Sequence, residues 1–450
     1  DDLFLNSSDN ILDIDHSGKG NITVGATKVI SQWVSYSGVN KEEWSGGSAF
    51  FSNGDIAEVI VEGNSDGSKS LVLKRLDEDG SFIWSKSIQA DYAPHAGSLL
   101  IDNSNNIFII GGTKKGASGE SGLNDSDVFA TKLSSSGDKI WYKNFGIGIH
   151  EIGASGILDK DGNILLNGRI SEVNDQYRFI KNVDNFYGAP FSSGWRGFQL
   201  KVNNSDGSVV KAYTTGSYNS GGELISFDKT RNIAFVGGYT FGAVNGVPTI
   251  GNGDPNGANQ YLIARNETNG SILWTRMENW VRSNIVVQES EDAIYFVDKG
   301  NLEKISGSTG KQIWSKQIDN AQYVLSKAFD GGILLAKQIN TNEIIVKNFD
   351  KNGSEKKSQT INHTGSVSLQ NITDKGDGIL LVSGRTTGEV NLENGIKKIN
   401  NPGSGNDSFL LKIESSFSQE VKGNIIEDKN TLPTSFEGFE VIRLDEGSDI

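Results

Sequence analysis

The sequence predicts an all-β fold, a seven-bladed β-propeller of four-stranded antiparallel blades, because three short patterns recur in a fixed order along its 450 residues. A turn followed by an aliphatic strand occurs seven times, and an alternating strand that ends in a cation also occurs seven times. Alternation of polar and apolar residues is the period of a half-buried strand. Hairpins with the pattern Gly-x-x-x-Trp follow these strands. The copies that end at Trp274 and Trp314 lie 40 positions apart, which is enough for the four strands of a blade.

Each repeat contains these elements in the same order. The aliphatic strands are predicted at residues 56–63, 107–112, 164–166, 233–238, 293–297, 332–335 and 378–382. The alternating strands end at Lys74, Lys132, Lys201, Arg265, Lys304, Lys347 and Lys412. The hairpins lie at 80–84, 137–141, 270–274 and 310–314, with two weaker copies at 207–211 and 353–357 that have Lys in place of Trp. We interpret the Trp rings as packing between neighbouring blades, where a large aromatic side chain fills the gap.

A segment that precedes the first repeat is predicted to close the ring. Residues 29–36 have the pattern of an outer strand and contain Trp33, whereas the last repeat has no Gly-x-x-x-Trp hairpin of its own. We therefore predict that residues 29–36 pair with the strand that ends at Lys412. Pairing by residues 419–424 in that place would contradict this prediction.

The predicted domain organisation follows from this ring. Residues 1–28 form an N-terminal extension, residues 29–422 form the seven-bladed propeller, and residues 423–450 form a C-terminal tail or a linker to a further domain. The tail contains one strand-like segment at 439–444. Such a strand could add to an exposed sheet edge, including that of a neighbouring molecule, or it could lead into a further domain.

Composition excludes several classes of chemistry and partner. The chain has no cysteine, so disulfides and thiolate chemistry are excluded. Its net charge of −14 argues against nucleic acid, whose binding requires clustered Lys and Arg. No apolar run approaches the roughly 18 residues of a membrane-spanning helix, so we expect no membrane insertion.

One carboxylate-rich turn could bind calcium. Asp159, Asp161 and Asn163 present oxygen atoms at alternating positions, which suits a hard cation. The distal Glu of an EF-hand loop is missing, and Asp and Asn also favour turns for local hydrogen-bonding reasons. Calcium binding and simple turn chemistry therefore both stay open, and no other cofactor is expected.

The connections between the second and third strands indicate where a binding surface lies. These connections are long in blades 2, 3, 4 and 7, and they all leave the same face of a propeller. Long loops in a compact domain are often functional, and aromatic and Arg side chains are favoured at binding sites. The alternative is that the rings form a small core beneath the loop itself. The candidate binding residues are Tyr177, Phe186, Tyr187, Trp195, Arg196, Tyr239 and Phe241.

Two stretches resemble known repeat families. Residues 302–314 contain Thr309-Gly310-Lys311 followed by Trp314 and resemble the PQQ-like, quinoprotein-type propeller repeat. Residues 95–146 are similar to the bacterial β-propeller repeat called SBBP, and together the two patterns cover roughly residues 47–416. The resemblance implies a propeller fold and a bacterial or phage origin. We expect a secreted or cell-surface location. Such repeats occur in dehydrogenases, outer-membrane assembly scaffolds and surface proteins, so the resemblance does not choose among functions.

Three functional hypotheses follow. The first is a non-enzymatic extracellular or cell-surface protein that binds protein or carbohydrate through the long loops of blades 2–4. The second is a structural subunit of a surface assembly or filament that self-associates through its termini. The third is a PQQ-type or carbohydrate-active enzyme. Two observations count against it: the sequence has no vicinal Cys pair, and it has no Ser-His-Asp arrangement that its spacing could support.

Overall fold

The computed structural model describes the main part of each predicted repeat. The described residues are 4–6, 13–17, 21–25, 32–37, 43–64, 69–88, 95–113, 127–145, 150–172, 186–187, 194–215, 220–250, 257–328, 331–339, 342–375, 379–391, 397–399, 406–414, 421–424, 435–436 and 439–442.

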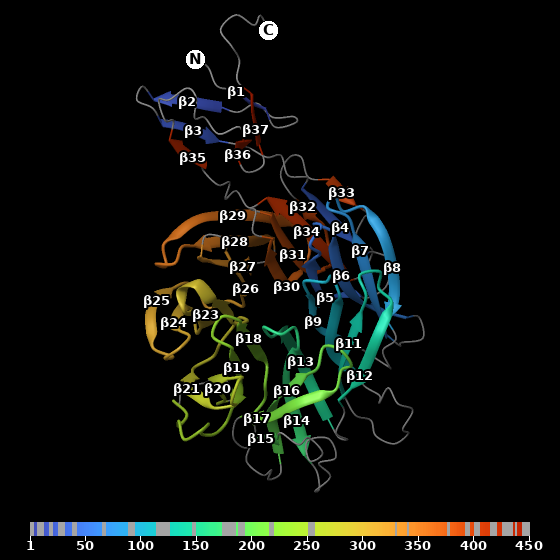
Figure 1. The fold of residues 1–450 in the computed structure, drawn as a ribbon, viewed down its shortest axis with the longest axis vertical. Helices are drawn as coiled ribbons and strands as arrows, with labels where there is room; N and C mark the ends of the chain where they lie inside the picture. Colours follow the sequence, from blue (N-terminus) through green and yellow to red (C-terminus); the bar gives the residue numbers. More distant parts are fainter. Residues whose placement is uncertain are drawn as a thin grey trace, which may run out of the picture.

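Seven antiparallel sheets surround a common centre (Figure 1). Blades 1 and 2 consist of β5 (Glu43–Phe50), β6 (Ile56–Gly63), β7 (Lys69–Leu76), β8 (Phe82–Ile88), β9 (His95–Ile101), β10 (Ile107–Thr113), β11 (Asp127–Leu133) and β12 (Lys139–Asn144). Blades 3 and 4 consist of β13 (His150–Leu158), β14 (Ile164–Glu172), β16 (Gly194–Val202), β17 (Val209–Thr215), β18 (Leu224–Asp228), β19 (Ile233–Thr240), β20 (Asn259–Asn266) and β21 (Ile272–Glu278).

The remaining three blades continue the ring in chain order. Blades 5 and 6 consist of β22 (Val286–Gln288), β23 (Ala293–Asp298), β24 (Asn301–Ser306), β25 (Gln312–Gln317), β26 (Val324–Lys327), β27 (Ile333–Ile339), β28 (Glu343–Phe349) and β29 (Glu355–His363). Blade 7 consists of β30 (Val367–Asp374), β31 (Ile379–Thr386), β34 (Asp407–Glu414) and β4 (Trp33–Tyr36). The predicted fold class, an all-β seven-bladed propeller, is therefore confirmed.

The apolar core is divided into layers between neighbouring blades. The second strands are buried on both sides, so their sequences are continuous aliphatic runs, and all seven residues of β10 are buried. Side chains of blades 2 and 3 share one buried cluster, those of blades 4 and 5 share another, and those of blades 6 and 7 share a third. Each blade is thus stabilised mainly by its two neighbours.

The predicted closing strand is confirmed. β4 pairs antiparallel with β34, with Trp33 opposite Lys412 and Tyr36 opposite Phe409. Residues 421–424 do not occupy this position, because β35 (Val421–Asn424) pairs with β3 (Asn21–Gly25). Blade 7 is therefore built from both ends of the propeller sequence. Because β4 is followed along the chain by β5 of blade 1, its pairing with β34 closes the ring.

The predicted packing of Trp between blades is also confirmed, and its geometry is specific. The Trp141 indole Nε1 and the Lys132 ammonium both donate to the Asn204 carbonyl oxygen of the next blade, at 2.9 and 3.4 Å. Trp141 and Lys132 are cross-strand partners. The hairpin glycine of that next blade, Gly207, lies against the Trp141 ring so closely that a Cβ would be 2.9 Å from it. We call this arrangement of indole, cation, carbonyl and glycine the blade joint.

The blade joint recurs around the ring. Trp314 and Lys304 donate to the Lys351 carbonyl at 3.0 and 2.9 Å. At the ring closure, Trp33 and Lys412 donate to the Glu78 carbonyl at 3.1 and 2.6 Å. The Gly-x-x-x-Trp pattern therefore records contacts between successive blades as well as a hairpin within each blade.

The long connections of blades 3 and 7 add short strands at the rim. β15 (Phe186–Tyr187) pairs in parallel with β17, the outermost strand of blade 3. β33 (Lys397–Ile399) pairs in parallel with β4, the outermost strand of blade 7. β32 (Val390–Asn391) pairs with the end of β29 in blade 6. Each of these additions covers backbone groups that would otherwise form an open sheet edge.

Strands from the two ends of the chain pair with each other. β1 (Phe4–Asn6) pairs with β37 (Phe439–Ile442), which also pairs with β36 (Ser435–Phe436). β3 pairs with both β2 (Asp13–Ser17) and β35. The predicted tail strand at 439–444 thus corresponds to β37, and the predicted boundary after residue 422 falls inside β35. The division into three domains stays a prediction.

Candidate functional site

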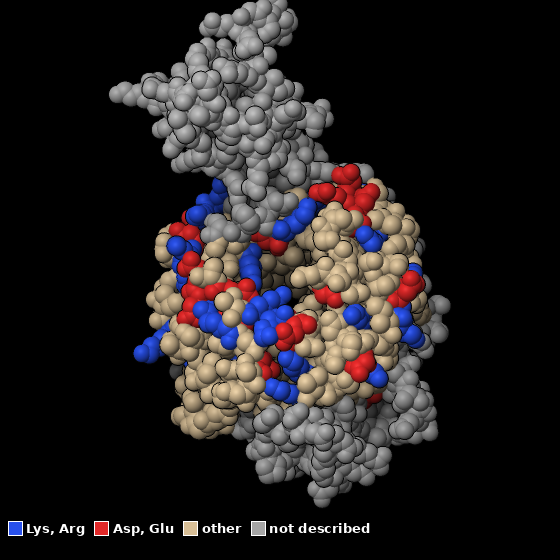
Figure 2. Space-filling model, viewed as in Figure 1, with Lys and Arg blue, Asp and Glu red and all other residues tan. Residues whose placement is uncertain are grey.

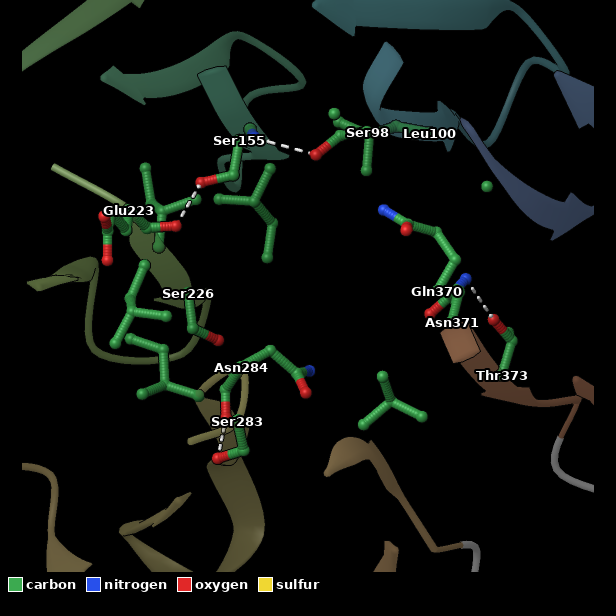
Figure 3. A pocket seen from close by; sticks show the side chains of 18 of the residues that line it. Ser98, Leu100, Ser155, Glu223, Ser226, Ser283, Asn284, Gln370, Asn371 and Thr373 are labelled. Carbon is green, nitrogen blue, oxygen red and sulfur yellow. Dashed lines mark hydrogen bonds between the residues drawn. The ribbon is translucent and has the colours of Figure 1, made fainter. Parts of the chain in front are cut away.

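The innermost strands of the blades line a central channel. Its cavity of about 1020 Å³ is lined by β5, β9, β13, β18, β26 and β30 together with the segment before β22. Figure 3 shows small polar side chains along this wall, among them Ser98, Ser155, Ser226 and Asn284. A channel of this volume has room for a small ligand.

Several of these polar side chains hold adjacent blades together. The Ser98 hydroxyl accepts the backbone N–H of Gly156 at 3.0 Å, and the Ser155 hydroxyl donates to the Glu223 carbonyl at 3.0 Å. The Asn284 amide group donates to the Leu325 carbonyl at 2.8 Å and accepts the Leu325 N–H at 2.7 Å. These contacts give the channel lining a structural role, because the polar atoms already have partners across the blade boundaries.

The two ends of the channel differ in their surroundings. We call the face with the connections from second to third strands the loop face, and the face with the tight turns between first and second strands the turn face. At the turn face, the 3-10 turn η1 (Glu289–Glu291) contributes Glu291, which lies 3.7 Å from Lys304 and 3.6 Å from Lys351. Figure 2 shows Lys and Arg beside the central hollow with acidic residues next to them. The charges there are mixed, as an ion-pair network requires, and do not form a surface of one sign.

At the loop face, a stacked pair flanks the channel. The Arg282 guanidinium lies 3.5 Å from the centre of the Trp280 ring, and both residues line the cavity. The loop that carries them is anchored to blade 5, because Asp298 accepts the Trp280 backbone N–H at 2.6 Å. Among the described residues, no hydrogen-bond partner is found for the buried Arg282 Nε.

A second Arg is held between aromatic rings at the loop face of blades 3 and 4. The Arg169 guanidinium lies 5.0 Å from the Trp195 ring centre and 5.7 Å from that of Tyr239. Its Nη1 donates to the Tyr239 hydroxyl at 3.1 Å. Phe241 meets Tyr239 edge to face at 6.2 Å and is 48% exposed. We call Arg169, Trp195, Tyr239 and Phe241 the aromatic patch.

The aromatic patch is electrostatically connected to the channel. Glu223 directly precedes β18, the innermost strand of blade 4, and lines the cavity. Burial raises the pKa of the Glu223 carboxyl, because it disfavours the charged form, and the positive charge of Arg169 partly offsets this effect. The Gly222 N–H also donates to the Gly168 carbonyl at 3.1 Å, so the backbone next to Glu223 contacts the backbone next to Arg169, and the patch borders the channel.

The structure brings together some of the predicted binding residues. Trp195, Tyr239 and Phe241 belong to the aromatic patch, whereas Arg196 is buried. The backbone of Phe186 and Tyr187 lies in β15 at the rim of blade 3. Tyr177 lies outside the described residues. The assignment of these residues to a binding site stays a prediction.

Sequence reasoning missed three residues of this surface: Arg169, Trp280 and Arg282. Arg169 lies three residues after the aliphatic strand predicted at 164–166, and Trp280 is a Trp outside the Gly-x-x-x-Trp pattern. Either departure from the repeat could have identified the loop face of blades 3–5. A residue that breaks a repeat without serving the repeated contact is a candidate for function.

The predicted calcium turn is held by internal contacts. The Asp159 Oδ1 accepts the backbone N–H groups of Asp161 and Asn163 at 2.9 and 2.8 Å. Its Oδ2 lies 2.5 Å from the Lys201 ammonium, and Asp161 pairs with Lys160 at 2.7 Å. Calcium binding here stays a prediction. Across the described part of the chain, no group of three or more His, Asp or Glu side chains is placed to hold a metal ion.

Comparisons with known proteins assign no function to the chain. No family model matches the sequence, and no curated protein does. In the described residues, no helix is long and apolar enough to cross a membrane.

Solved propeller structures are similar to the chain at low identity. BamB from Moraxella catarrhalis has a TM-score of 0.39 and 11% identity, covering 81% of this chain and 95% of BamB. The Pan2 WD40 domain of Neurospora crassa has a TM-score of 0.49 and 8% identity over 84% and 91% of the two chains. The Cps50 (Swd1) β-propeller domain of Myceliophteria thermophila has a TM-score of 0.47 and 10% identity over 82% and 96%.

Proposed function

We propose that this chain is a non-enzymatic binding protein that recognises a protein partner through the loop face of blades 3 and 4. The observation that carries the proposal is the aromatic patch, in which one guanidinium is held between two rings beside the exposed Phe241. Trp, Tyr and Arg dominate the energetics of protein interfaces, because they combine a large contact area with directed polar groups.

The geometry favours recognition over catalysis in the described residues. Arg169 is oriented by Tyr239, and its guanidinium has further N–H donors that a partner could use. Stacking on rings restricts the guanidinium before binding, which lowers the entropy lost in the complex. The resemblance of the repeats to those of bacterial surface propellers supports a secreted or cell-surface setting for this binding, which cell fractionation would test.

Two surface substitutions test the proposal. Arg169→Gln and Phe241→Ser should each weaken partner capture at least tenfold, equivalent to about 1.4 kcal/mol, and leave the melting temperature unchanged. Phe82→Ser is the matched control, because Phe82 is a similarly exposed ring on the rim of blade 1. Loss of stability without loss of binding would show that the patch is a local core. Retained protein capture would reject the site, and binding of glycans alone would reject the protein partner.

A further inference from the structure

Arg282 is a cation of the channel wall for which the protein supplies no counter-ion. In the part of the chain that the structure describes, no hydrogen bond and no ion pair is found for its guanidinium, and its Nε is buried. By contrast, Lys327, a cation that lines the turn-face end of the same cavity, lies 3.9 Å from Glu289. A charged donor that is partly desolvated and unpaired costs free energy, so such a group in a folded protein requires an explanation.

The guanidinium of Arg282 is held in place by contacts on several sides. Its backbone N–H donates to the Val297 carbonyl at 2.8 Å, and its carbonyl accepts the Tyr323 N–H at 2.9 Å. The guanidinium stacks on the Trp280 ring at 3.5 Å, and Asp298 fixes the loop by accepting the Trp280 N–H at 2.6 Å. A guanidinium restrained in this way loses little freedom when it binds an anion.

Gln260 adds a second set of donors at the same end of the channel. Its Oε1 accepts the backbone N–H of Val281, the residue before Arg282, at 2.7 Å. This contact identifies the amide oxygen, so the Nε2 group is a donor, and no partner is found for it among the described residues. Gln260 lines the cavity, and its cross-strand neighbour Glu278 is engaged by Arg276 at 2.6 Å. The N–H donors of Gln260 and Arg282 are thus available together to an anion.

The surroundings favour one carboxylate on a hydroxylated molecule. Paired N–H groups of a guanidinium match the two oxygens of a carboxylate. Glu223 lines the same cavity, and its negative charge disfavours a ligand with more than one negative charge. Figure 3 shows Ser226 and Gln370 directed into the cavity, where no partner is found for either side chain among the described residues. Hydroxyl groups of a ligand are suitable partners for both, and about 1020 Å³ accommodates a small molecule.

We propose that the loop-face end of the channel binds a small hydroxylated monocarboxylate, a sugar acid. Arg282 and Gln260 hold its carboxylate, and the polar channel wall contacts its hydroxyl groups. The ligand supplies the negative charge that the described residues do not offer to Arg282. This site lies between blades 4 and 5 and is formed by residues outside the aromatic patch. It does not depend on the proposed function.

The probe that tests the proposal is D-glucuronate, titrated into the full chain by calorimetry. D-glucose is the matched control, because it has a hydroxymethyl group where D-glucuronate has the carboxylate. Acetate is the second control, because it has a carboxylate and no hydroxyl groups. We expect saturable binding of D-glucuronate, and binding at least tenfold weaker for each control.

Substitutions at the two donor residues locate the site. Arg282→Gln should weaken D-glucuronate binding at least tenfold, and Arg282→Lys should weaken it less, because Lys retains the charge but not the paired N–H groups. Gln260→Glu keeps an acceptor for the Val281 N–H, loses the amide donors and adds a negative charge, so it should also lose binding. Lys327→Gln and Arg169→Gln are the controls, since they remove a cation from the turn face and from the aromatic patch. Both should bind D-glucuronate as the parent protein does.

Several results would overturn the proposal. The absence of saturable binding, equal binding of D-glucose, or undiminished binding by Arg282→Gln would each reject the carboxylate site. Equal binding of acetate would reject the hydroxylated ligand. If Arg282→Gln melts early, Gln260→Glu and the comparison of probes on the parent protein still decide. Weaker partner capture by Arg282→Gln, without D-glucuronate binding, would assign the guanidinium to a carboxylate of the protein partner instead.

Discussion

At the scale of single residues, the repeated sequence pattern is explained by the blade joint. The indole and the ammonium converge on one carbonyl oxygen, so each needs the other blade to satisfy its hydrogen bond. The hairpin glycine has a positive φ and also provides the space that the neighbouring ring occupies. Glycine is therefore needed at this position for two reasons, which act in different blades.

Gly137→Ala should destabilise the protein more than Gly246→Ala. Both glycines have φ near +80°, at 78° and 80°, so both substitutions cost about 1–2 kcal/mol for the left-handed backbone. A Cβ at Gly137 would also lie 2.7 Å from the Trp84 ring, whereas nothing lies within 4 Å of a Cβ at Gly246. Overpacking adds about 1–3 kcal/mol. Denaturant unfolding measures both variants, and equal losses would show that the contact with Trp84 has no energetic weight.

Buried glutamates should make stability fall between about pH 4.5 and pH 7. Burial raises the pKa of Glu43 from 4.5 to about 7 and that of Glu278 to about 6. The unfolded chain releases these protons near pH 4.5, whereas the folded chain retains them to higher pH. The stabilisation is complete below pH 4.5 and is lost as the pH rises through the folded pKa values.

Glu43→Gln should therefore flatten this part of the pH profile. Each unit of pKa shift corresponds to about 1.4 kcal/mol. The unfolding free energy at pH 4.5 and pH 7.5 should differ less in the variant than in the parent protein, and the exposed Glu343→Gln is the control. An identical difference in both proteins would show that Glu43 is ionised in the folded state at pH 4.5.

At the scale of secondary structure elements, the ring depends on one short strand. β4 has four residues, yet it supplies the outer strand of blade 7 and the blade joint to blade 1. The added strand β33 packs on its other side. Elements at both ends of the propeller sequence thus meet at a single seam.

Trp33→Ala should be more destabilising than Trp314→Ala. Trp33 is fully buried at the closing seam, whereas Trp314 is partly exposed. Removal of a buried Trp costs about 3–5 kcal/mol, and loss at the seam also weakens the closure of the ring. Thermal unfolding of both variants checks the order. A larger effect of Trp314→Ala would show that the seam carries no special share of the stability.

At the scale of the whole molecule, the propeller is a closed series of similar interfaces. The described terminal strands β1, β2, β3, β35, β36 and β37 pair with one another and with no strand of a blade. The blades therefore complete their own hydrogen bonding between β4 and β34. Closure removes the open ends that a linear repeat array would have.

A chain trimmed to residues 29–416 should consequently fold and melt cooperatively. Its melting temperature should lie within about 4 °C of the parent value, because a change of that size corresponds to roughly 1 kcal/mol in a large domain. Calorimetry checks this expectation and tests the predicted domain division. Loss of cooperative melting would show that the terminal sheets are part of the same folding unit.

Much of the fold could be predicted from the sequence because it depends on local, repeated patterns. The seven aliphatic strands and the closing segment with Trp33 are examples. The role of individual cations was less predictable. In blade 1, Arg75 rather than Lys74 donates to a carbonyl of the next blade, that of Ser135, at 2.8 Å. Lys74 instead lies opposite Glu58. Arg75 lies opposite Trp84, as Lys132 lies opposite Trp141. Because Lys74 and Arg75 are adjacent cations, the sequence pattern did not reveal which of them is the cross-strand partner of the Trp.

The sequence by itself determined the blade count, the order of strands and the closing strand, because periodicity and turn residues act over a few positions along the chain. Only the tertiary structure decided which distant residues meet. It placed Arg169 near both Trp195 and Tyr239, and it put Trp280 and Arg282 at the channel. These features depend on contacts between blades and on the paths of long connections. No spacing along one strand specifies either of them.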